Sequence, residues 1–264
     1  MAAAAERGLE VVGADLPELD ITDAAAVPRL VEQTAPEVIV NCAAFTAVDA
    51  AEELEQEALA VNGLAVATLA ETANRAGATL VQLSTDYVFA GEAGHPYRED
   101  DPPAPRSAYG RTKLAGEVAA ARADRHLIVR TAWLFGEGRG NFVEAIRRQL
   151  TGGATTLRVV DDQTGSPTYA TDLAGALLDL VALGATGTVH AVNEGRVTWC
   201  GLARAIVAGL GTDVEVVPIT TAEAARPAPR PAFSVLDTGR LHALLGHRLP
   251  DWRDALARYL AAVR

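Results

Sequence analysis

The chain has 264 residues, 49% of them hydrophobic and 22% charged, which is ordinary for a globular protein with a sizeable core. The formal net charge is −11 and the chain has no run of basic residues, which excludes a basic surface that could bind many phosphate groups. We therefore expect neither a nucleic acid nor a membrane as a partner. Two cysteines make no disulfide framework and no apolar stretch reaches 18 residues, so we expect a cytoplasmic protein.

The first two-thirds of the chain alternates short β-branched runs with alanine-rich amphipathic stretches. In chain order, the expected elements are a strand at Leu9–Ala14, a helix at Ala24–Thr34, a strand at Glu37–Asn41, a helical region at Ala47–Ala76, a strand at Thr79–Leu83, a helix at Ser107–Arg122, a strand at Leu127–Thr131 and a helix at Phe142–Leu150. This alternation predicts an α/β fold, a doubly wound parallel sheet of Rossmann type with helices on both faces.

The final third has shorter elements and a proline-rich segment, Arg226–Pro231. A strand is expected at Val214–Val217 and helices at Thr238–Leu245 and Trp252–Val263. We therefore divide the chain into a first domain of residues 1–150 and a smaller mixed α/β region of residues 151–264. This second region should pack over the crevice of the sheet, with some of its elements returning to the sheet.

Lys113 is the only lysine, whereas the other 22 basic residues are all arginine. A lysine ammonium is a compact point charge that a guanidinium does not replace in a tight pocket. Tyr109 precedes Lys113 by four positions, which places both side chains on one face of the expected helix. The alternative for Lys113 is a solvated position on the helix surface.

A hydroxyl group lies where the Thr79–Leu83 strand ends, because Ser84, Thr85, Asp86 and Tyr87 follow it directly. Ligands bind beyond the carboxyl ends of the strands in such sheets. A lysine ammonium near Tyr109 should lower the phenol pKa from about 10 toward working pH, which suits a general acid. Thr85 can bind the same substrate oxygen. This arrangement favours reduction of a carbonyl by hydride from a nicotinamide, with Tyr109 supplying the proton.

The chain resembles the extended short-chain dehydrogenase/reductases, and within them the dTDP-4-dehydrorhamnose reductase family. Eight ordered segments carry the resemblance: LDITD (Leu19–Asp23), VIVNCAAFTAVDAAE (Val38–Glu52), LSTDYVFAG (Leu83–Gly91), SAYGRTKLAGE (Ser107–Glu117), RTAWLFG (Arg130–Gly136), GNFV (Gly140–Val143), VVDDQTGSPTY (Val159–Tyr169) and RPAFSVLD (Arg230–Asp237). A tyrosine and lysine at this spacing are a weak signal alone, but eight segments at compatible spacing are a strong one.

The resemblance implies a role for each matching residue. Tyr109 would donate the proton to the C4 keto oxygen, Lys113 would activate it and hold the nicotinamide ribose, and Thr85 would tune the transfer. Cofactor-binding residues would be Asp15, Asp20, Ile21, Ala43, Ala44, Phe45, Tyr109 and Lys113. Substrate-binding residues would be Thr46, Val48, Thr85, Asp86, Tyr87 and Trp133. Arg226 and Arg230 are candidates for the substrate diphosphate, or for a plain surface turn.

The implied activity is reduction of dTDP-4-dehydro-6-deoxy-L-mannose to dTDP-L-rhamnose, or of a related sugar in antibiotic biosynthesis, with NADPH or NADH. Asp15 tilts the cofactor choice toward NADH, because a carboxylate repels a 2′-phosphate. Residues 1–150 would be the nucleotide-cofactor domain and residues 151–264 mainly the substrate-binding region. Mg²⁺ near acidic residues such as Asp161 and Asp162 is a further option, and the oligomeric state stays open, with a homodimer as one alternative.

The start of the chain departs from the family pattern, since no glycine-rich phosphate-binding turn precedes Gly8. We expect the cofactor domain to be incomplete there, with a gap between the Leu9–Ala14 and Glu37–Asn41 strands. Two other functions remain open. One is a nucleotide-sugar epimerase or dehydratase with the same Tyr109 and Lys113 pair, and the other is a non-catalytic regulatory subunit resembling the beta subunit of methionine adenosyltransferase.

Overall fold

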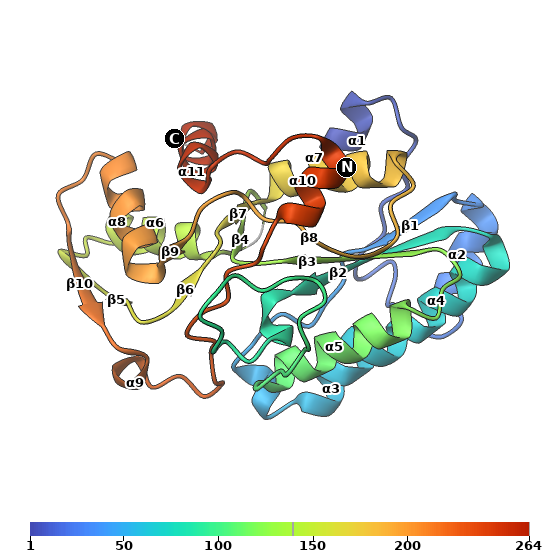
Figure 1. The fold of residues 1–264 in the computed structure, drawn as a ribbon, viewed down its shortest axis with the longest axis horizontal. Helices are drawn as coiled ribbons and strands as arrows, with labels where there is room; N and C mark the ends of the chain where they lie inside the picture. The colour runs from blue at the N-terminus through green and yellow to red at the C-terminus, as the bar shows by residue number, and fades with distance from the viewer. Residues whose placement is uncertain (139, 264) are drawn as a thin grey trace.

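A parallel four-stranded sheet forms the centre of the computed structural model, which describes residues 1–138 and 140–263 (Figure 1). The strand order is β1-β2-β3-β8, and all three strand pairs are parallel. The strands are β1 (Val38–Asn41), β2 (Thr79–Thr85), β3 (His126–Thr131) and β8 (Gly187–His190). The predicted α/β class with a parallel sheet is confirmed. The sequence analysis did not predict β8, the fourth strand.

Helices cover both faces of this sheet (Figure 1). One face carries α2 (Ala26–Thr34), α4 (Ala65–Ala76) and α5 (Ala108–Ala120), and the other carries α7 (Ala170–Ala182) and α10 (Gly239–Leu245), with α1 (Ala2–Glu6) against α7. The strand side chains alternate between the two layers: Leu80 and Ile128 pack among the first helices, whereas Val81 and Val129 pack among the second. Burial on both faces explains why these strands are almost continuously apolar.

The stretch between β1 and β2 corrects the prediction of one helical region at Ala47–Ala76. It consists of a 3₁₀ turn (Ala50–Glu52), α3 (Glu55–Leu59), a π-helical turn (Ala60–Leu64) and α4. The π turn lies where this stretch meets α5: a Cβ on Gly116 would come within 2.1 Å of the Asn62 carbonyl oxygen. The close packing of the two backbones, together with the side-chain bonds of Asn62 described below, accounts for the interruption.

The predicted strand at Leu9–Ala14 is wrong. These residues have no regular structure, and Leu9 and Val12 are 50% and 58% exposed. A strand needs a neighbouring strand to satisfy its backbone groups, and in the described residues β1 is the edge strand with β2 as its one neighbour. The segment therefore stays irregular and runs from α1 along the outside of the sheet.

Residues after β3 build a second core around helices and short strands. Its elements are β4 (Leu134–Phe135), α6 (Phe142–Thr151), β5 (Thr156–Val160), β6 (Thr164–Gly165), β7 (Thr168–Tyr169), β9 (Val197–Thr198), α8 (Trp199–Gly209), β10 (Glu215–Ile219), α9 (Thr221–Ala224) and α11 (Trp252–Ala262). The paired strands are β5 with β10, β4 with β7, and β6 with β9. The division at residue 150 stays a prediction, and β8, α7 and α10 from the later segment lie on the central sheet.

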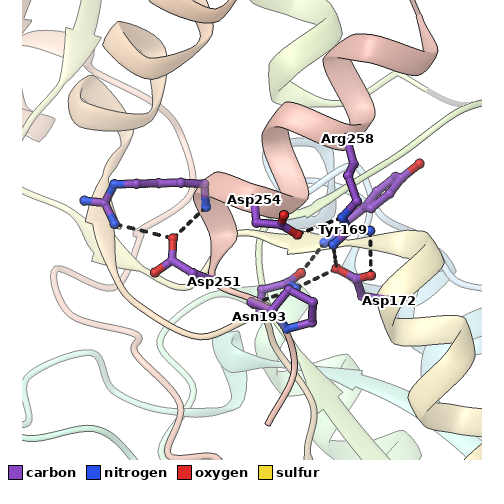
Figure 2. Close-up of polar contacts among 8 residues, drawn as sticks. Tyr169, Asp172, Asn193, Asp251, Asp254 and Arg258 are labelled. Carbon is purple, nitrogen blue, oxygen red and sulfur yellow. Dashed lines mark hydrogen bonds and ion pairs between the residues drawn. The ribbon is translucent and has the colours of Figure 1, made fainter.

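A polar network fixes α11 to the rest of the molecule (Figure 2). The Arg258 guanidinium donates two hydrogen bonds to Asp172 at 2.9 and 2.7 Å and lies over the Tyr169 ring. Asn193 donates to the same carboxylate at 2.7 Å and accepts from the Tyr169 backbone N–H at 2.8 Å. The bidentate geometry makes this a strong attachment of α11 to α7 and β7. Within the described residues, no helix is both long and apolar enough to cross a membrane.

Candidate active site

The start of α5 places Tyr109 beside the end of β2. The Ser107 hydroxyl caps the helix by accepting from the Gly110 N–H at 3.0 Å. Gly110 lies directly against the carbonyl of Tyr87, where a Cβ would come within 2.3 Å of the oxygen. The rings of Tyr87 and Tyr109 meet edge to face, with centroids 5.5 Å apart. Glycine at position 110 therefore allows the helix to approach the Thr85–Tyr87 turn closely.

Tyr109, Thr85 and Asp86 form a hydrogen-bonded chain. The Thr85 hydroxyl donates to the Asp86 carboxylate at 3.0 Å, accepts from the Tyr87 N–H at 3.2 Å and is hydrogen-bonded to Tyr109. A hydroxyl has one proton and two lone pairs. The bond with Thr85 lowers the phenol pKa, which requires Thr85 to donate to the Tyr109 oxygen, so the single Thr85 proton serves either Asp86 or Tyr109. The structure thus brings Tyr109 and Thr85 together as expected, but the Thr85 proton must turn away from Asp86 before Thr85 can donate to a substrate oxygen.

The expected lowering of the Tyr109 pKa is not found. Burial raises the pKa of Tyr109 to about 12, the hydrogen bond with Thr85 opposes that rise, and the charge of Asp86 adds to it. The prediction that Lys113 lowers this pKa is therefore wrong for this structure. The physical reason is desolvation, which disfavours a phenolate in this apolar surrounding. Tyr109 is accordingly held as a neutral phenol, the form that a proton donor requires.

Lys113 is buried and points to the sheet rather than to solvent. Its side chain is 4% exposed, and Nζ donates to the Leu83 carbonyl of β2 at 2.7 Å. Burial lowers the pKa of Lys113 to about 8, while the nearby Glu117 carboxylate raises it. The alternative of a solvated surface lysine is thereby excluded. The Leu83 bond uses one of three N–H donors, which leaves two for another ligand.

A buried ion pair lies one helical turn beyond Lys113. Glu117 accepts from the Arg130 guanidinium at 2.9 and 2.7 Å and from the Ser84 hydroxyl at 2.5 Å, and both charged side chains are about 5% exposed. The cluster ties α5 to β2 and β3 directly below the site. The sequence analysis missed it, although Glu117 repeats the four-residue spacing of Tyr109 and Lys113.

The loop Ala43–Phe45 is held by two amide side chains. Asn62 accepts from the Phe45 N–H at 2.9 Å and donates to the Phe45 carbonyl at 3.1 Å, while Asn41 accepts from the Ala43 N–H at 3.1 Å. Asn62 also donates to Thr112 of α5 at 3.1 Å, so it links this loop to the helix of Tyr109. The sequence analysis did not assign this role to Asn62, although a polar asparagine within an alanine-rich helical stretch could have indicated it.

The other predicted cofactor residues lie on the exposed N-terminal segment. Asp15 is exposed and lines a hollow of about 360 Å³ with Arg29 and Gln33 of α2. Asp20 is exposed and accepts from the Thr22 N–H and hydroxyl, which lower its pKa. Ile21 packs on the edge of the core formed by α2 and α4. The structure does not gather Asp20 and Ile21 into the hollow beside Asp15.

The predicted substrate residues lie on three loops. Thr46 is exposed and Val48 half-buried after β1, while Asp86 and Tyr87 follow β2. Trp133 follows β3, two residues after Thr131, whose Cα pairs with that of Thr85. Strand register thus places all three loops at one edge of the sheet.

Both candidate arginines for the diphosphate lie at the carboxylate of Asp49, but only Arg226 remains exposed, with 66% of its side chain accessible against 18% for Arg230. Arg230 donates to both oxygens of Asp49 at 2.9 Å, Arg226 lies 3.7 Å from the same carboxylate, and the Ala228 N–H donates to it. The hydrogen bond from Arg230 lowers the pKa of the Asp49 carboxyl and burial raises it, and the net effect is a lowered pKa. This pair joins the loop after β1 to the proline-rich segment.

No group of three or more His, Cys, Asp or Glu side chains in the described part of the chain could hold a metal ion. Asp161 and Asp162 instead bond to Thr198 and Thr221 at 2.5 and 2.6 Å. The site therefore has a proton donor, a buried ammonium and an ordered hydroxyl, which can protonate an oxygen and hold ribose hydroxyls, but it shows no built metal centre.

Comparisons with known proteins show the family of the chain. A family model described as the RmlD substrate binding domain matches residues 1–264. A dTDP-4-dehydrorhamnose reductase of Streptomyces griseus is 47% identical, covering 97% of this chain and 87% of its own length. A probable dTDP-4,6-dihydroxy-2-methyloxan-3-one 4-ketoreductase of Streptomyces antibioticus is 45% identical over 95% of this chain and 85% of its own.

A solved structure shows the same fold. The dTDP-4-dehydrorhamnose reductase of Bacillus anthracis in complex with NADP superimposes with a TM-score of 0.94 at 34% identity, covering 97% of this chain and 92% of that one. Family match, sequence identity and fold all extend over nearly the whole chain. The chain therefore belongs to the RmlD family of dTDP-4-dehydrorhamnose reductases.

Proposed function

We propose that this chain reduces the C4 keto group of dTDP-4-dehydro-6-deoxy-L-mannose to dTDP-L-rhamnose, or that of a closely related deoxysugar nucleotide. The observation that carries the proposal is the hydrogen bond between Tyr109 and Thr85 with Lys113 one turn further along α5. These groups lie at the carboxyl edge of β2 in a chain 47% identical to a dTDP-4-dehydrorhamnose reductase. The proposal makes the chain an NAD(P)H-dependent oxidoreductase.

Tyr109 acts as the proton donor. A neutral phenol with a pKa of about 12 protonates the C4 oxygen as negative charge develops on it. The proton of the Thr85 hydroxyl, which rests on Asp86, turns to the substrate oxygen during the reaction. The ammonium of Lys113 stabilises the phenolate that remains. The partial burial of Tyr109 strengthens each of these interactions, because water does not screen them.

A nicotinamide cofactor, when bound, supplies the hydride. Lys113 has two N–H donors for the hydroxyls of its ribose, and the Ala43–Phe45 backbone, fixed by Asn62, offers a surface for the dinucleotide. The NADP complex of the Bacillus anthracis relative supports NADPH. Asp15 would favour NADH, so we propose that the chain accepts both. The proposal assigns no role to Mg²⁺.

The substrate side is formed by Thr46, Val48, Asp86, Tyr87 and Trp133, which line the same edge of the sheet. Asp49 and Arg230 hold the loop of Thr46 and Val48 against the proline-rich segment. In this proposal Arg230 shapes the pocket, and the diphosphate interacts with Arg226, whose side chain is 66% exposed. The Streptomyces antibioticus relative supports a 4-keto deoxysugar as the substrate class.

The decisive test is the stoichiometry of cofactor use. The purified chain should consume one NADPH for each dTDP-4-dehydro-6-deoxy-L-mannose reduced, followed by absorbance and by mass spectrometry of the sugar nucleotide. An epimerase or dehydratase would convert its sugar without net NADPH consumption. A regulatory subunit would show neither conversion nor consumption, and would co-purify with a partner enzyme. Either result would overturn the proposal.

A further inference from the structure

Trp133 has a backbone conformation that its neighbours must maintain. Its φ angle is +47°, in the left-handed region that bulky side chains rarely adopt. The Trp133 carbonyl accepts from the Thr168 N–H at 3.2 Å, which fixes the backbone between β3 and β4. Such strain persists where surrounding contacts over-determine the conformation, and it concentrates at functional sites.

The Trp133 indole stacks on Trp199, the first residue of α8. The two ring centroids are 3.5 Å apart and the rings are within 5° of parallel. Phe142 packs on Trp199 at 4.6 Å, so the stack is anchored in the second core. Gly165 completes the contact: a Cβ at that position would come within 2.4 Å of the Trp133 ring. The indole therefore rests directly on the backbone of Gly165.

Gly165 and Trp199 are held by one small two-stranded sheet. Gly165 belongs to β6 and pairs with Val197 of β9, and Trp199 follows β9 directly. Thr198 caps α8 through the Gly201 N–H and donates to Asp161 at 2.5 Å. The strand pair β6–β9 thus holds Gly165 and Trp199 rigidly in place. We call these two residues the indole seat.

We propose that Trp199 is a positioning residue for the sugar, acting only through Trp133. This inference rests on the proposed function, which places Trp133 at the substrate edge of the sheet. The stack covers one face of the half-buried Trp133 ring, and in this proposal the exposed part of the ring contacts the sugar. A deoxysugar presents C–H groups and a methyl group, and an indole fixed in one orientation binds such an apolar surface without first losing rotamer freedom. The indole seat would therefore set affinity and orientation of the sugar, not the chemistry at Tyr109.

The test combines spectroscopy with a double-mutant cycle. Stacked indoles couple their electronic transitions, so the wild type should show an exciton couplet in circular dichroism that Trp199→Ala abolishes. Trp252→Phe is the matched control, because Trp252 is buried in the second core and its indole N–H makes no hydrogen bond. That control should keep both the couplet and the kinetics. Trp199→Phe should restore most of the sugar affinity, because a phenyl ring still covers the indole.

Kinetics decide the assignment. Trp199→Ala should raise KM for the sugar nucleotide about tenfold, change kcat less than about threefold and leave KM for NADPH unchanged. In a Trp133→Ala background, Trp199→Ala should add nothing further. Unchanged KM despite a lost couplet, or additive effects in the cycle, would overturn the inference while leaving the reductase function intact. A wild type that turns over no 4-keto sugar would overturn both.

Discussion

Two regions of this molecule were assigned to one cofactor site, and they differ in how the fold holds them. The unit of β2 and α5, with Arg130 of β3, is buried: Lys113, Asp86, Glu117 and Arg130 are each at most 5% exposed, and each makes a hydrogen bond within this unit. The N-terminal segment, residues 9–25, is largely exposed and bonds mainly to itself, as Asp20 does to Thr22. The proposed catalytic geometry is thus fixed by many contacts, whereas the segment proposed for the adenosine depends on local turns.

This difference predicts that changes in the β2–α5 unit act strongly on both stability and rate. Changes in the N-terminal segment should act weakly and mainly on cofactor preference. The four variants that follow are ordered by expected effect.

Tyr109→Phe should lower kcat by about 10²–10⁴, because it removes the general acid. Binding of the sugar nucleotide should change little, since the ring contact with Tyr87 remains. NADPH oxidation measures the rate, and titration calorimetry measures binding. Tyr169→Phe, which removes a phenol oxygen in the second core, serves as the control and should keep wild-type kinetics. Comparable rates for Tyr109→Phe and wild type would refute the role of Tyr109.

Arg130→Met should lower the free energy of unfolding by about 3–5 kcal/mol, because it leaves the buried Glu117 carboxylate without its partner. Arg29→Met breaks the exposed pair with Asp23 of the N-terminal segment, at 3.4 Å, and should cost less than about 1 kcal/mol. Urea unfolding of both variants compares the two regions directly. Equal losses would mean that burial does not distinguish them.

Asp86→Asn should change how stability depends on pH. Burial raises the pKa of Asp86 from 3.8 to about 6, so between these values the folded state holds a proton that the unfolded state has released. Stability from this group therefore falls as pH rises from about 4 to 6, and ionised Asp86 destabilises the fold above that range. A shift of about two units corresponds to about 3 kcal/mol.

The Asn variant, which does not titrate, should gain stability relative to wild type as pH rises from 4 to 7. Urea unfolding of both proteins at pH 4 and at pH 7 gives this difference. The contribution of the hydrogen bond from Thr85 largely cancels between the two proteins, because the amide oxygen of asparagine can also accept it. A pH-independent difference between the two proteins would contradict a raised pKa of Asp86 in the folded state.

Asp15→Ala should have the smallest effect. Loss of one exposed hydrogen-bond acceptor should raise KM for NADH about two- to tenfold, with less change for NADPH, and leave the melting temperature unaltered. Asp213→Ala removes an exposed carboxylate elsewhere and controls for net charge. If NADPH were affected more than NADH, Asp15 would not discriminate against the 2′-phosphate.

Much of the central fold followed from local pattern. The apolar runs predicted β1, β2 and β3 within a few residues, and the spacing of Tyr109 and Lys113 predicted their common helix. The strand at Leu9–Ala14 failed, because strand formation depends on a neighbouring strand, and the gap expected beside these residues leaves them without one. β8 was missed because its sequence, GTVH, has Val189 as its single aliphatic residue and so shows no apolar run. The π turn around Asn62 arises from packing against Gly116, a tertiary cause.

The site was predicted better in its residues than in its electrostatics. Tyr109 and Thr85 do meet, but burial raises the phenol pKa, whereas Lys113 was expected to lower it. Contacts between side chains of distant segments, such as Asp49 with Arg230 and Trp133 with Trp199, could not be predicted from the spacing of these residues along the sequence. They depend on how loops from different strands converge at one edge of the sheet.

Gly110 limits how this helix can be engineered. Replacing glycine by alanine inside a helix usually stabilises a protein, because alanine orders at lower entropic cost. At position 110 the added methyl group would collide with the Tyr87 carbonyl and push the catalytic phenol away from Thr85. A thermostabilised version of this enzyme should therefore keep glycine next to its tyrosine, and directed evolution at that codon should return glycine alone.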